Sequence, residues 1–439
     1  MSPAELVERI WARDATVWTG SDEARWLGWL DEPGRMRERL AEIERPDVDA
    51  CVLLGMGGSS LAPEVLRRTF GAEGFHVLDT THPRAIRALE QQLDPERTLF
   101  VAASKSGSTL ETRSHLDYFW ERGGRFAAIT DPGSSLEALA RERGFEAIYP
   151  GEPTIGGRYS ALSPFGIVPA ALMGLDAGAL LERAEEMADA CRGESSPGLE
   201  LGLQLGEGWR EGRDKVCLDG GEGFGLWAEQ LIAESTGKEG KGLVPAPGES
   251  ADGPDRQGAE VRLGDPYDLG AEFFRWEFAV AVAGAILEIN PFDQPNVQEA
   301  KDRTAAVLDS GEDPPLEPDG SVDDLLAGAK EGDYVCIQAF IDPAAEARLE
   351  SLLAKAHETG CVVTHGLGPR YLHSTGQLHK GGPNTGLFIQ VVDDTGEELP
   401  IPGKPFGFGR LIRAQAAGDF ESLKERGRRV ARVRLEDVS

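Results

Sequence analysis

The sequence predicts an α/β protein in which parallel strands alternate with helices. Short continuous apolar runs such as residues 51–54 are typical of central parallel strands. A helical pattern follows the run, at residues 61–70, and the same rhythm repeats along the chain. Because parallel sheets bind ligands at the carboxyl ends of their strands, Gly55 and Ser104 mark the edge where we expect a site.

The first half of the chain predicts a helical segment and one doubly wound domain. Residues 1–45 carry Trp, Leu and Ile at helical intervals, which predicts an N-terminal helical extension. Residues 46–192 predict the first domain. Its strands are expected at 51–54, 75–78, 98–103, 125–129 and 147–149, and its helices at 61–70, 83–92, 111–122, 135–143 and 169–192. The stretch Gly193-Glu-Ser-Ser-Pro197 marks the domain boundary.

The second half of the chain restarts the α/β pattern. Residues 198–345 predict a second domain, with strands at 215–218 and 334–341, helices at 226–235 and 274–289, and a solvated loop at 309–324. Residues 346–439 predict a C-terminal extension. It should contain a strand at 387–392 and a basic helix near 420–432.

The composition excludes several classes of protein. With 45 Lys and Arg against 75 Asp and Glu, the formal charge of −30 disfavours binding to nucleic acid or to an anionic membrane surface. The longest apolar stretches, 165–175 and 278–287, have about half of the roughly 20 residues that span a bilayer. The charged N-terminus leaves no room for a secretory signal. Five scattered cysteines without a C-x-x-C pair fit a reducing compartment, so we expect a cytoplasmic protein.

Two polar loops follow predicted strands. Gly55-Met-Gly-Gly-Ser-Ser60 offers close backbone approach and amides at the start of a helix, which favour an anion. Ser104-Lys-Ser-Gly-Ser-Thr109 adds four hydroxyls and one cation at a second strand end. Each loop alone is also typical of a tight turn or a helix cap. Together they favour a small phosphomonoester rather than a nucleotide.

Three further segments give the sequence a family resemblance. They are Ile155-Gly-Gly-Arg-Tyr-Ser160, Glu229-Gln-Leu-Ile-Ala-Glu-Ser-Thr-Gly-Lys238 and Asn290-Pro-Phe-Asp-Gln-Pro-Asn-Val-Gln-Glu-Ala-Lys301. With the two loops they resemble the phosphoglucose isomerase family, from about residue 50 to residue 301. The resemblance implies two three-layer α/β/α sugar isomerase (SIS) domains with mainly parallel sheets. In detail, the sequence resembles the isomerase half of bacterial transaldolase and glucose-6-phosphate isomerase fusions, without a transaldolase portion.

The resemblance also implies a set of site residues. Those that would bind the substrate phosphate are Gly58, Ser59, Ser104, Lys105, Ser106 and Thr109. Arg158 would steady an enediolate, and Glu234 would be the general base, with Gln230 one helical turn earlier on the same face. Gln294 and Lys301 would contact the phosphate and the ring-oxygen region. The family uses no metal, and no cofactor is implied.

The chemistry of these residues leads to the same reaction independently. An aldose and a ketose interconvert through a cis-enediolate, which needs a carboxylate beside C1 and C2 and a fixed cation near the developing oxyanion. Glu234 and Arg158 fill these two roles. Each residue alone is more often a surface glutamate or a structural arginine, so only the combination argues for catalysis.

The histidine pattern departs from the family. Residues 239–290 contain no His, whereas the segment from His373 to Gly382 resembles the family's His segment but follows Lys301. The resemblance therefore assigns ring opening to His373, contributed across a dimer interface, with His379 as the substitute. A zinc site built from Cys361, His365, His373 and His379 is an alternative, as are histidines that only hydrogen-bond loops.

The resemblance implies a homodimeric isomerase of glucose 6-phosphate and fructose 6-phosphate. A dual enzyme that also acts on mannose 6-phosphate stays open, because Thr236 lies two residues after Glu234 and could position a water. A non-catalytic sugar-phosphate sensor is the other alternative. It would need the two loops but not Glu234, Arg158 and Lys301.

Overall fold

The computed structural model describes residues 1–193, 196–221, 223–295, 297–311, 313–314, 316–393 and 396–438, and of residues 297–302 it describes the backbone. The chain divides into two compact units. The first comprises Met1–Leu78, Asp94–Thr236 and Leu243–Asp293, and the second comprises Asp79–Leu93, Gly237–Gly242 and Gln294–Ser439.

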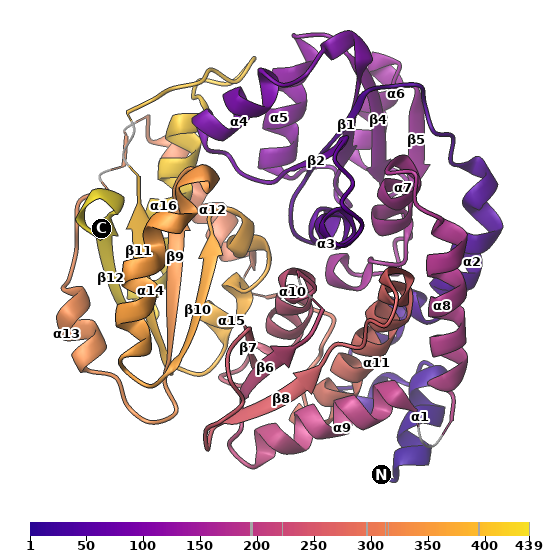
Figure 1. The fold of residues 1–439 in the computed structure, drawn as a ribbon, viewed down its shortest axis with the longest axis vertical. Helices are drawn as coiled ribbons and strands as arrows, with labels where there is room; N and C mark the ends of the chain where they lie inside the picture. The colour runs from indigo at the N-terminus through magenta and orange to yellow at the C-terminus, as the bar shows by residue number, and fades with distance from the viewer. Residues whose placement is uncertain are drawn as a thin grey trace. The chain divides into compact units, whose positions relative to one another are not determined.

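The first unit contains the five-stranded parallel sheet that the sequence predicts, in the order β2-β1-β3-β4-β5. Its strands are β1 (Ala50–Gly55), β2 (Phe75–Leu78), β3 (Thr98–Ala103), β4 (Arg125–Thr130) and β5 (Ala147–Pro150). Figure 1 shows this sheet with helices around it. On one face Leu53, Val101 and Ile129 pack against Phe165 and its neighbours, and on the other Phe100 stacks on Phe119. The helices α7 (Pro164–Leu172) and α5 (Leu110–Trp120) therefore cover opposite faces, as in a three-layer domain.

The rest of the first unit is a helical layer and a small second sheet. Its helices are α1 (Pro3–Trp11), α2 (Glu32–Arg39), α3 (Leu61–Phe70), α6 (Ser135–Arg143), α8 (Ala177–Ala190), α9 (Pro197–Arg210), α10 (Gly225–Thr236) and α11 (Leu269–Leu287). The predicted helical extension packs on the buried α11, because Trp11 stacks on Phe274 and the indole of Trp18 donates to Ala281 O at 2.8 Å. The small parallel sheet has the order β7-β6-β8, with β6 (Lys215–Asp219), β7 (Val244–Pro247) and β8 (Arg256–Glu260).

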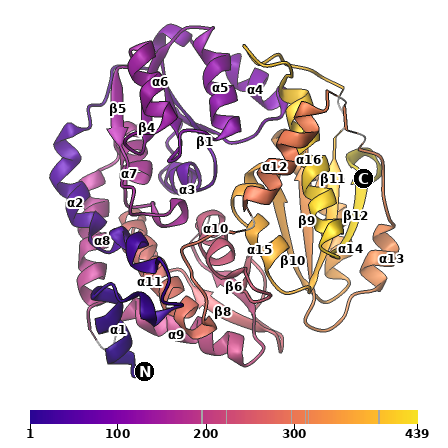
Figure 2. The ribbon, with the colours of Figure 1, turned by 180° about the vertical axis from the view of Figure 1, so that it is seen from behind.

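The second unit is built on a four-stranded parallel sheet of order β10-β9-β11-β12 (Figure 2). Its strands are β9 (Tyr334–Phe340), β10 (Val362–Leu367), β11 (Gly386–Val392) and β12 (Arg429–Arg434), and its helices are α4 (Pro83–Glu90), α12 (Val297–Asp309), α13 (Val322–Ala327), α14 (Glu350–His357), α15 (Gly376–Gly381) and α16 (Phe408–Glu425). Leu326 and Leu352 pack on one face of this sheet, and Ile412 and Ala416 of α16 pack on the other. The predicted fold class, α/β with parallel sheets, is confirmed.

Two predicted helices differ from the structure. The helix expected at 169–192 is two helices, because Gly174 takes a φ of +82° and Asp176 starts α8 by accepting from Ala179 N at 3.0 Å. The basic helix expected near 420–432 ends at Glu425, and Gly427 then turns the chain into β12. Within β12, Arg432 lies buried and donates to Gln390, so its charge does not mark a solvated helix face.

The sheets also group the second half differently from the expected segments. Strands β6 and β9, both expected in residues 198–345, lie in different sheets, and the expected extension 346–439 supplies β10, β11 and β12. A parallel sheet needs only strands joined by crossover connections, so adjacent strands can come from distant residues. The boundaries 1–45, 46–192, 198–345 and 346–439 stay a prediction.

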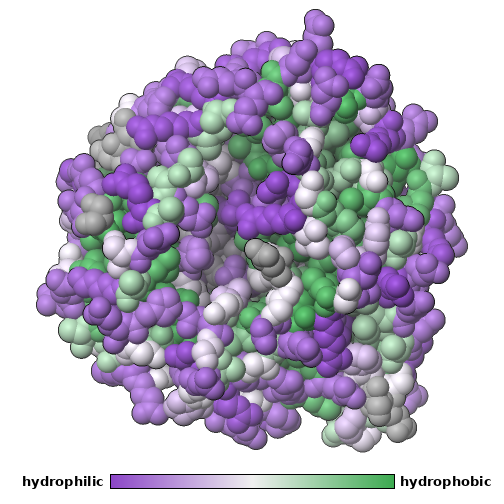
Figure 3. Space-filling model, in the orientation of Figure 1, coloured by the Kyte–Doolittle hydropathy of each residue, from purple (hydrophilic) through white to green (hydrophobic). Residues whose placement is uncertain are grey.

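The visible surface is largely polar. Figure 3 shows hydrophilic residues over most of the visible face. Among the described residues, Met1, at 63% exposed, is the only large hydrophobic side chain that stands out to solvent. No described helix combines the length and the apolar character needed to cross a membrane.

Candidate active site

The two predicted ligand loops lie side by side at one edge of the first sheet. Strands β1 and β3 are neighbours, and Gly55 is paired with Ala103 in their register. The strand order reverses between them, since the chain runs from β1 outward to β2 and then crosses to β3. Ligands in open α/β sheets bind at the carboxyl ends of strands at such a switch point. The fold therefore brings both loops to the edge where a site is expected.

The first loop is a tight turn that makes close contact with a second turn. It spans Gly57–Ser59, and the second turn, Gly157–Tyr159, carries Arg158. A Cβ on Gly58 would lie 2.0 Å from Gly157 O, so this contact requires glycine. Ser59, which follows it, is buried at 7% exposed.

The hydroxyls of the second loop bond to one another. Ser104 Oγ lies 2.9 Å from Thr109 Oγ1 and accepts from Gly107 N at 3.1 Å. Ser106 Oγ lies 3.0 Å from Ser108 Oγ. These contacts shape the loop before the start of α5, with its polar atoms gathered at the helix N-terminus, where backbone amides favour an anion.

The ammonium group of Lys105 is already engaged. Its Nζ donates to Asp131 Oδ1 at 2.8 Å and to Glu152 O at 2.9 Å. Burial raises the pKa of Asp131, and the Lys105 charge opposes this rise. In this structure the Lys105 side chain thus holds the loop to the end of β4, and binding a phosphate through its ammonium would require it to leave Asp131.

Helix α10 presents the predicted base. Its buried face includes Glu234, which is 7% exposed. Gln230 lies one turn earlier and its Nε2 donates to Glu234 Oε2 at 3.0 Å, as their spacing predicts. This bond fixes the orientation of the carboxylate.

Arg158 joins three of the sequence segments at one point. Its Nε donates to Ser235 Oγ at 2.8 Å, and its Nη2 donates to Pro291 O at 2.6 Å and to Asp293 O at 2.9 Å. Its Nη1 lies 3.8 Å from Glu234 Oε2. The guanidinium is almost fully buried, at 1% exposed, and neutral carbonyl and hydroxyl oxygens hold it in place. A fixed cation and a carboxylate that can accept a proton are therefore adjacent.

The remaining predicted residues belong to the second unit, which is described by itself. Gln294 is exposed, His373 is half-buried in the turn Arg370–His373, and the side chain of Lys301 lies outside the described residues. Their predicted roles stay predictions.

His379 is a core residue. It is 3% exposed, its Nδ1 lies 3.1 Å from Gln338 Nε2, and its Nε2 lies 3.6 Å from Cys336 Sγ. Burial and the nearby Lys380 hold the pKa of His379 well below its usual range. Because its ring is packed between strand side chains, His379 is a poorer candidate for ring opening than His373.

The alternative zinc site finds no geometric support in the part of the chain that the structure describes. Nε2 of His365 lies 3.1 Å from Glu346 Oε1, and Cys361 Sγ lies 3.9 Å from Lys330 O. Within these ranges no three His, Cys, Asp or Glu side chains come together to hold a metal ion.

The sequence did not predict several groups that lie at the site. The carbonyls of Pro291 and Asp293 carry no side-chain signature, so no residue pattern reveals them. Ser235 follows the base directly and Asp131 follows the end of β4. The rule that singled out Gly55 and Ser104 could have found Asp131, because it selects polar residues at strand ends.

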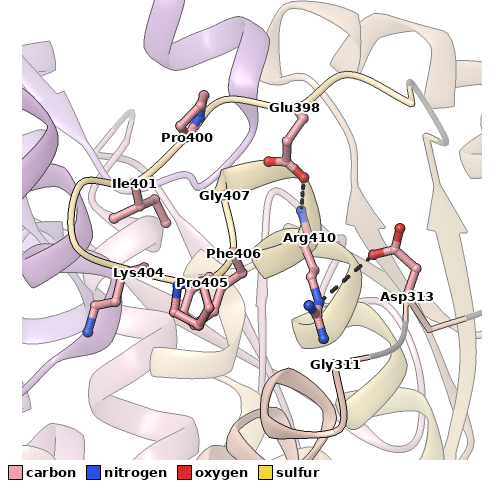
Figure 4. A pocket seen from close by; sticks show the side chains of 10 residues that line it. All are labelled: Gly311, Asp313, Glu398, Pro400, Ile401, Lys404, Pro405, Phe406, Gly407 and Arg410. Atoms are coloured by element: carbon pink, nitrogen blue, oxygen red, sulfur yellow. Dashed lines mark hydrogen bonds and ion pairs between the residues drawn. The ribbon is translucent and has the colours of Figure 1, made fainter.

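A surface pocket in the second unit lies at the start of α16 (Figure 4). The Glu398 carboxylate accepts from the backbone N–H groups of Gly409, at 2.8 Å, and Arg410, at 3.1 Å, and so occupies the helix N-terminus. Arg410 points toward Asp313. None of the predicted site residues lines this pocket.

The family profile of phosphoglucose isomerase matches residues 45–196. This stretch holds both ligand loops and Arg158, whereas Glu234 lies beyond it. A glucose-6-phosphate isomerase of Thermus thermophilus is 41% identical over 194 residues, which cover 39% of this chain and 46% of that protein. One from Carboxydothermus hydrogenoformans is 34% identical over 248 residues, covering 48% of this chain and 53% of that protein. The chain thus spans about half the length of the curated relatives it matches.

The fold has a solved counterpart. The crystal structure of a glucose-6-phosphate isomerase from Chlamydia trachomatis superposes with a TM-score of 0.53 at 19% identity, covering 70% of this chain and 78% of that one. At this identity the similarity concerns the fold alone. The profile match and the identity to the bacterial enzymes carry the relationship further: over residues 45–196, the chain is similar to the phosphoglucose isomerase family.

Proposed function

We propose that the protein is a glucose-6-phosphate isomerase that interconverts glucose 6-phosphate and fructose 6-phosphate. One observation carries the proposal: the buried guanidinium of Arg158 lies 3.8 Å from the Glu234 carboxylate. Arg158 also lies in the segment that matches the family profile, as do the two loops expected to bind phosphate, 55–60 and 104–109. The names of the bacterial relatives support the same activity.

The chemistry follows from these groups. The Glu234 carboxylate takes the proton from C2 of the open-chain aldose, and the electron pair left behind forms the C1–C2 double bond of a cis-enediolate. Arg158 stabilises the negative charge that develops on the sugar oxygens. Glu234 then returns the proton to C1, which gives the ketose. No redox partner is needed, because C1 is reduced as C2 is oxidised.

The other residues have supporting roles in this proposal. Gln230 orients Glu234 by its 3.0 Å hydrogen bond. Loop residues Ser59, Ser106 and Thr109 bind the phosphate with hydroxyl and amide groups, together with Gly58, Ser104 and Lys105. Gln294 and Lys301 contact the phosphate and ring-oxygen region, and His373 opens the ring.

Two alternatives make different demands on the site. A dual enzyme for mannose 6-phosphate would need a hydroxyl able to position water near the base. The hydroxyl of Thr236 instead donates to Ile232 O at 2.8 Å and accepts from Leu243 N at 2.9 Å, which favours the single specificity. A sugar-phosphate sensor would have no need of a buried arginine beside a carboxylate, since burying such groups is costly.

The first test is the conversion of fructose 6-phosphate in the presence of EDTA, coupled to glucose-6-phosphate dehydrogenase, with mannose 6-phosphate followed by product analysis. Formation of glucose 6-phosphate alone is the expected result. Formation of both products would replace the proposal by the dual enzyme. Binding of sugar phosphate without turnover would replace it by the sensor, and loss of activity that zinc restores would revive the metal site at Cys361 and His365.

Assembly and location are part of the same proposal. A homodimer is expected because the family completes its site with a histidine across the interface, and a cytoplasmic location is expected from the cysteine pattern. All five cysteines are free thiols in the structure. The similarity to the isomerase half of transaldolase fusions is also part of this proposal and stays a prediction.

A further inference from the structure

In the second unit, one buried carboxylate holds the chain on both sides of His373. Asp419 on α16 accepts from the hydroxyl of Tyr371 at 2.6 Å through Oδ2 and pairs with Lys380 Nζ through Oδ1. All three side chains are buried, with exposures of 2% for Asp419, 3% for Tyr371 and 3% for Lys380. Tyr371 lies two residues before His373, and Lys380 lies seven residues after it.

Further interactions support the anchors on this segment. Burial and the Asp419 carboxylate raise the pKa of Tyr371 well above its usual value, so the hydroxyl stays a donor. Arg428 holds the far end of the segment, because its Nη2 donates to Lys380 O at 2.7 Å and to Gly382 O at 2.8 Å. Asp419 thus bonds to Tyr371 and Lys380, and the buried guanidinium of Arg432 on β12 also interacts electrostatically with it. Arg428 bonds to the backbone at Lys380.

Stability alone does not account for this arrangement. The attraction within a buried ion pair does little more than offset the cost of removing both charges from water. Apolar residues of similar size can often replace such a pair without loss of stability. A buried pair is attested chiefly where it fixes one conformation among several. The segment fixed here carries His373, a half-buried histidine between two well-anchored points.

We propose that Asp419 is a positioning residue that holds His373 in the conformation needed for opening the sugar ring. The proposal deepens the assignment of His373 and rests on the proposed isomerase function. It acts on ring opening and leaves proton transfer at C1 and C2 to Glu234. Only sugars that must open a ring should depend on Asp419.

The test compares two substrates in the full chain. Glucose 6-phosphate must open a ring, whereas erythrose 4-phosphate cannot form one because its O4 carries the phosphate. The Asp419→Asn variant should lose about 10- to 100-fold in kcat for glucose 6-phosphate, the range expected when a supporting group is removed. Exchange of the C2 proton of erythrose 4-phosphate with deuterated water, followed by NMR, should stay within about 2-fold of the wild type.

Two further variants separate positioning from folding. The double variant Asp419→Leu/Lys380→Met removes both charges together, so it leaves no unpaired buried charge and should fold. It should still lose kcat for glucose 6-phosphate while keeping the proton exchange of erythrose 4-phosphate. Glu421→Gln removes an exposed charge from the same helix and should change neither rate. Equal losses on both substrates, or an unchanged glucose 6-phosphate rate in a folded variant, would overturn the proposal.

Hydrogen exchange provides a readout that does not depend on turnover. In the Asp419 variants, amide exchange should rise in residues 370–381 and stay unchanged in the strands β9 and β11. If the wild type converts neither substrate, the isomerase function fails, and the exchange result alone decides whether Asp419 positions this segment. Unchanged exchange in residues 370–381 would refute the positioning role.

Discussion

Replacement of Gly58 by alanine tests whether the contact between the two turns builds the site. A Cβ at this position would lie 2.0 Å from Gly157 O, whereas real Cβ atoms essentially never come closer than 3.0 Å to a neighbour. The two turns must therefore move apart by about 1 Å, and backbone on both sides leaves little room to adapt. A displacement of this size in a catalytic site can cost on the order of 10²-fold in rate, or about 2.7 kcal/mol of transition-state stabilisation.

The expected result for Gly58→Ala is therefore a kcat/KM for fructose 6-phosphate about 100-fold below the wild type. Overpacking should also lower the free energy of unfolding by about 1–3 kcal/mol, measured by urea denaturation. The matched control for stability is Gly156→Ala, since a Cβ on Gly156 meets nothing within 4 Å. A Gly58→Ala variant with wild-type kcat/KM, or with the stability of Gly156→Ala, would refute the structural argument.

Three more predictions concern the base, the assembly and a buried acid. Glu234→Gln should lower kcat by about 10³-fold or more while leaving sugar-phosphate binding by calorimetry nearly intact; equal loss of both would remove Glu234 from the role of base. Mixing the inactive variants Glu234→Gln and His373→Ala should restore about a quarter of wild-type activity if each site takes its histidine from the partner subunit. Half of the randomly formed dimers are then mixed, and each mixed dimer has one intact site of two. If no activity is restored, one chain builds each site. Burial, with Glu32 nearby, raises the pKa of Glu277 well above its usual value, and neither carboxyl oxygen has a hydrogen-bond partner. The folded state therefore holds this proton more tightly than the unfolded state, so the stabilisation is full below the unfolded pKa of about 4.5 and is lost as the pH rises toward the folded pKa. Relative to Glu277→Gln, the wild type should lose up to about 1.4 kcal/mol of unfolding free energy per pH unit above pH 4.5, and parallel pH profiles in urea denaturation would contradict this.

The first sheet could be predicted almost entirely from sequence, because its strands are continuous apolar runs that end in glycine or a polar residue. The run at residues 51–54 became β1 (Ala50–Gly55), for example. Strand β8 (Arg256–Glu260) was missed because its sequence, Arg-Gln-Gly-Ala-Glu, is largely polar and lies at the edge of a small sheet. Strand β12 was taken for part of a helix because three of its six residues are arginines, although Arg432 is buried against Gln390.

The candidate site could likewise be predicted only in part from the sequence. Gln230 and Glu234 could be placed on one helix face from their spacing alone, and their hydrogen bond agrees with it. The partners of Arg158 could not be foreseen, since two of them are backbone carbonyls, at Pro291 and Asp293, which the fold brings from more than a hundred residues away. Sequence patterns report side chains, whereas a buried guanidinium is satisfied mainly by whichever oxygens the fold supplies.

The surroundings of Lys105 and Arg158 suggest how a chain with a formal charge of −30 could bind the anionic substrate of the proposed reaction. Lys105 is neutralised by Asp131 at 2.8 Å, so the nearby loop offers a phosphate mainly hydroxyl and amide groups. Arg158 donates short hydrogen bonds to the neutral oxygens of Ser235 and Pro291, and its contact with Glu234 is longer, at 3.8 Å. If Glu234 takes up the substrate proton, its negative charge passes to the enediolate and the field of Arg158 acts on the sugar instead. In the proposed reaction, Arg158 would then stabilise the enediolate more than the open-chain sugar, which is the differential stabilisation that catalysis requires.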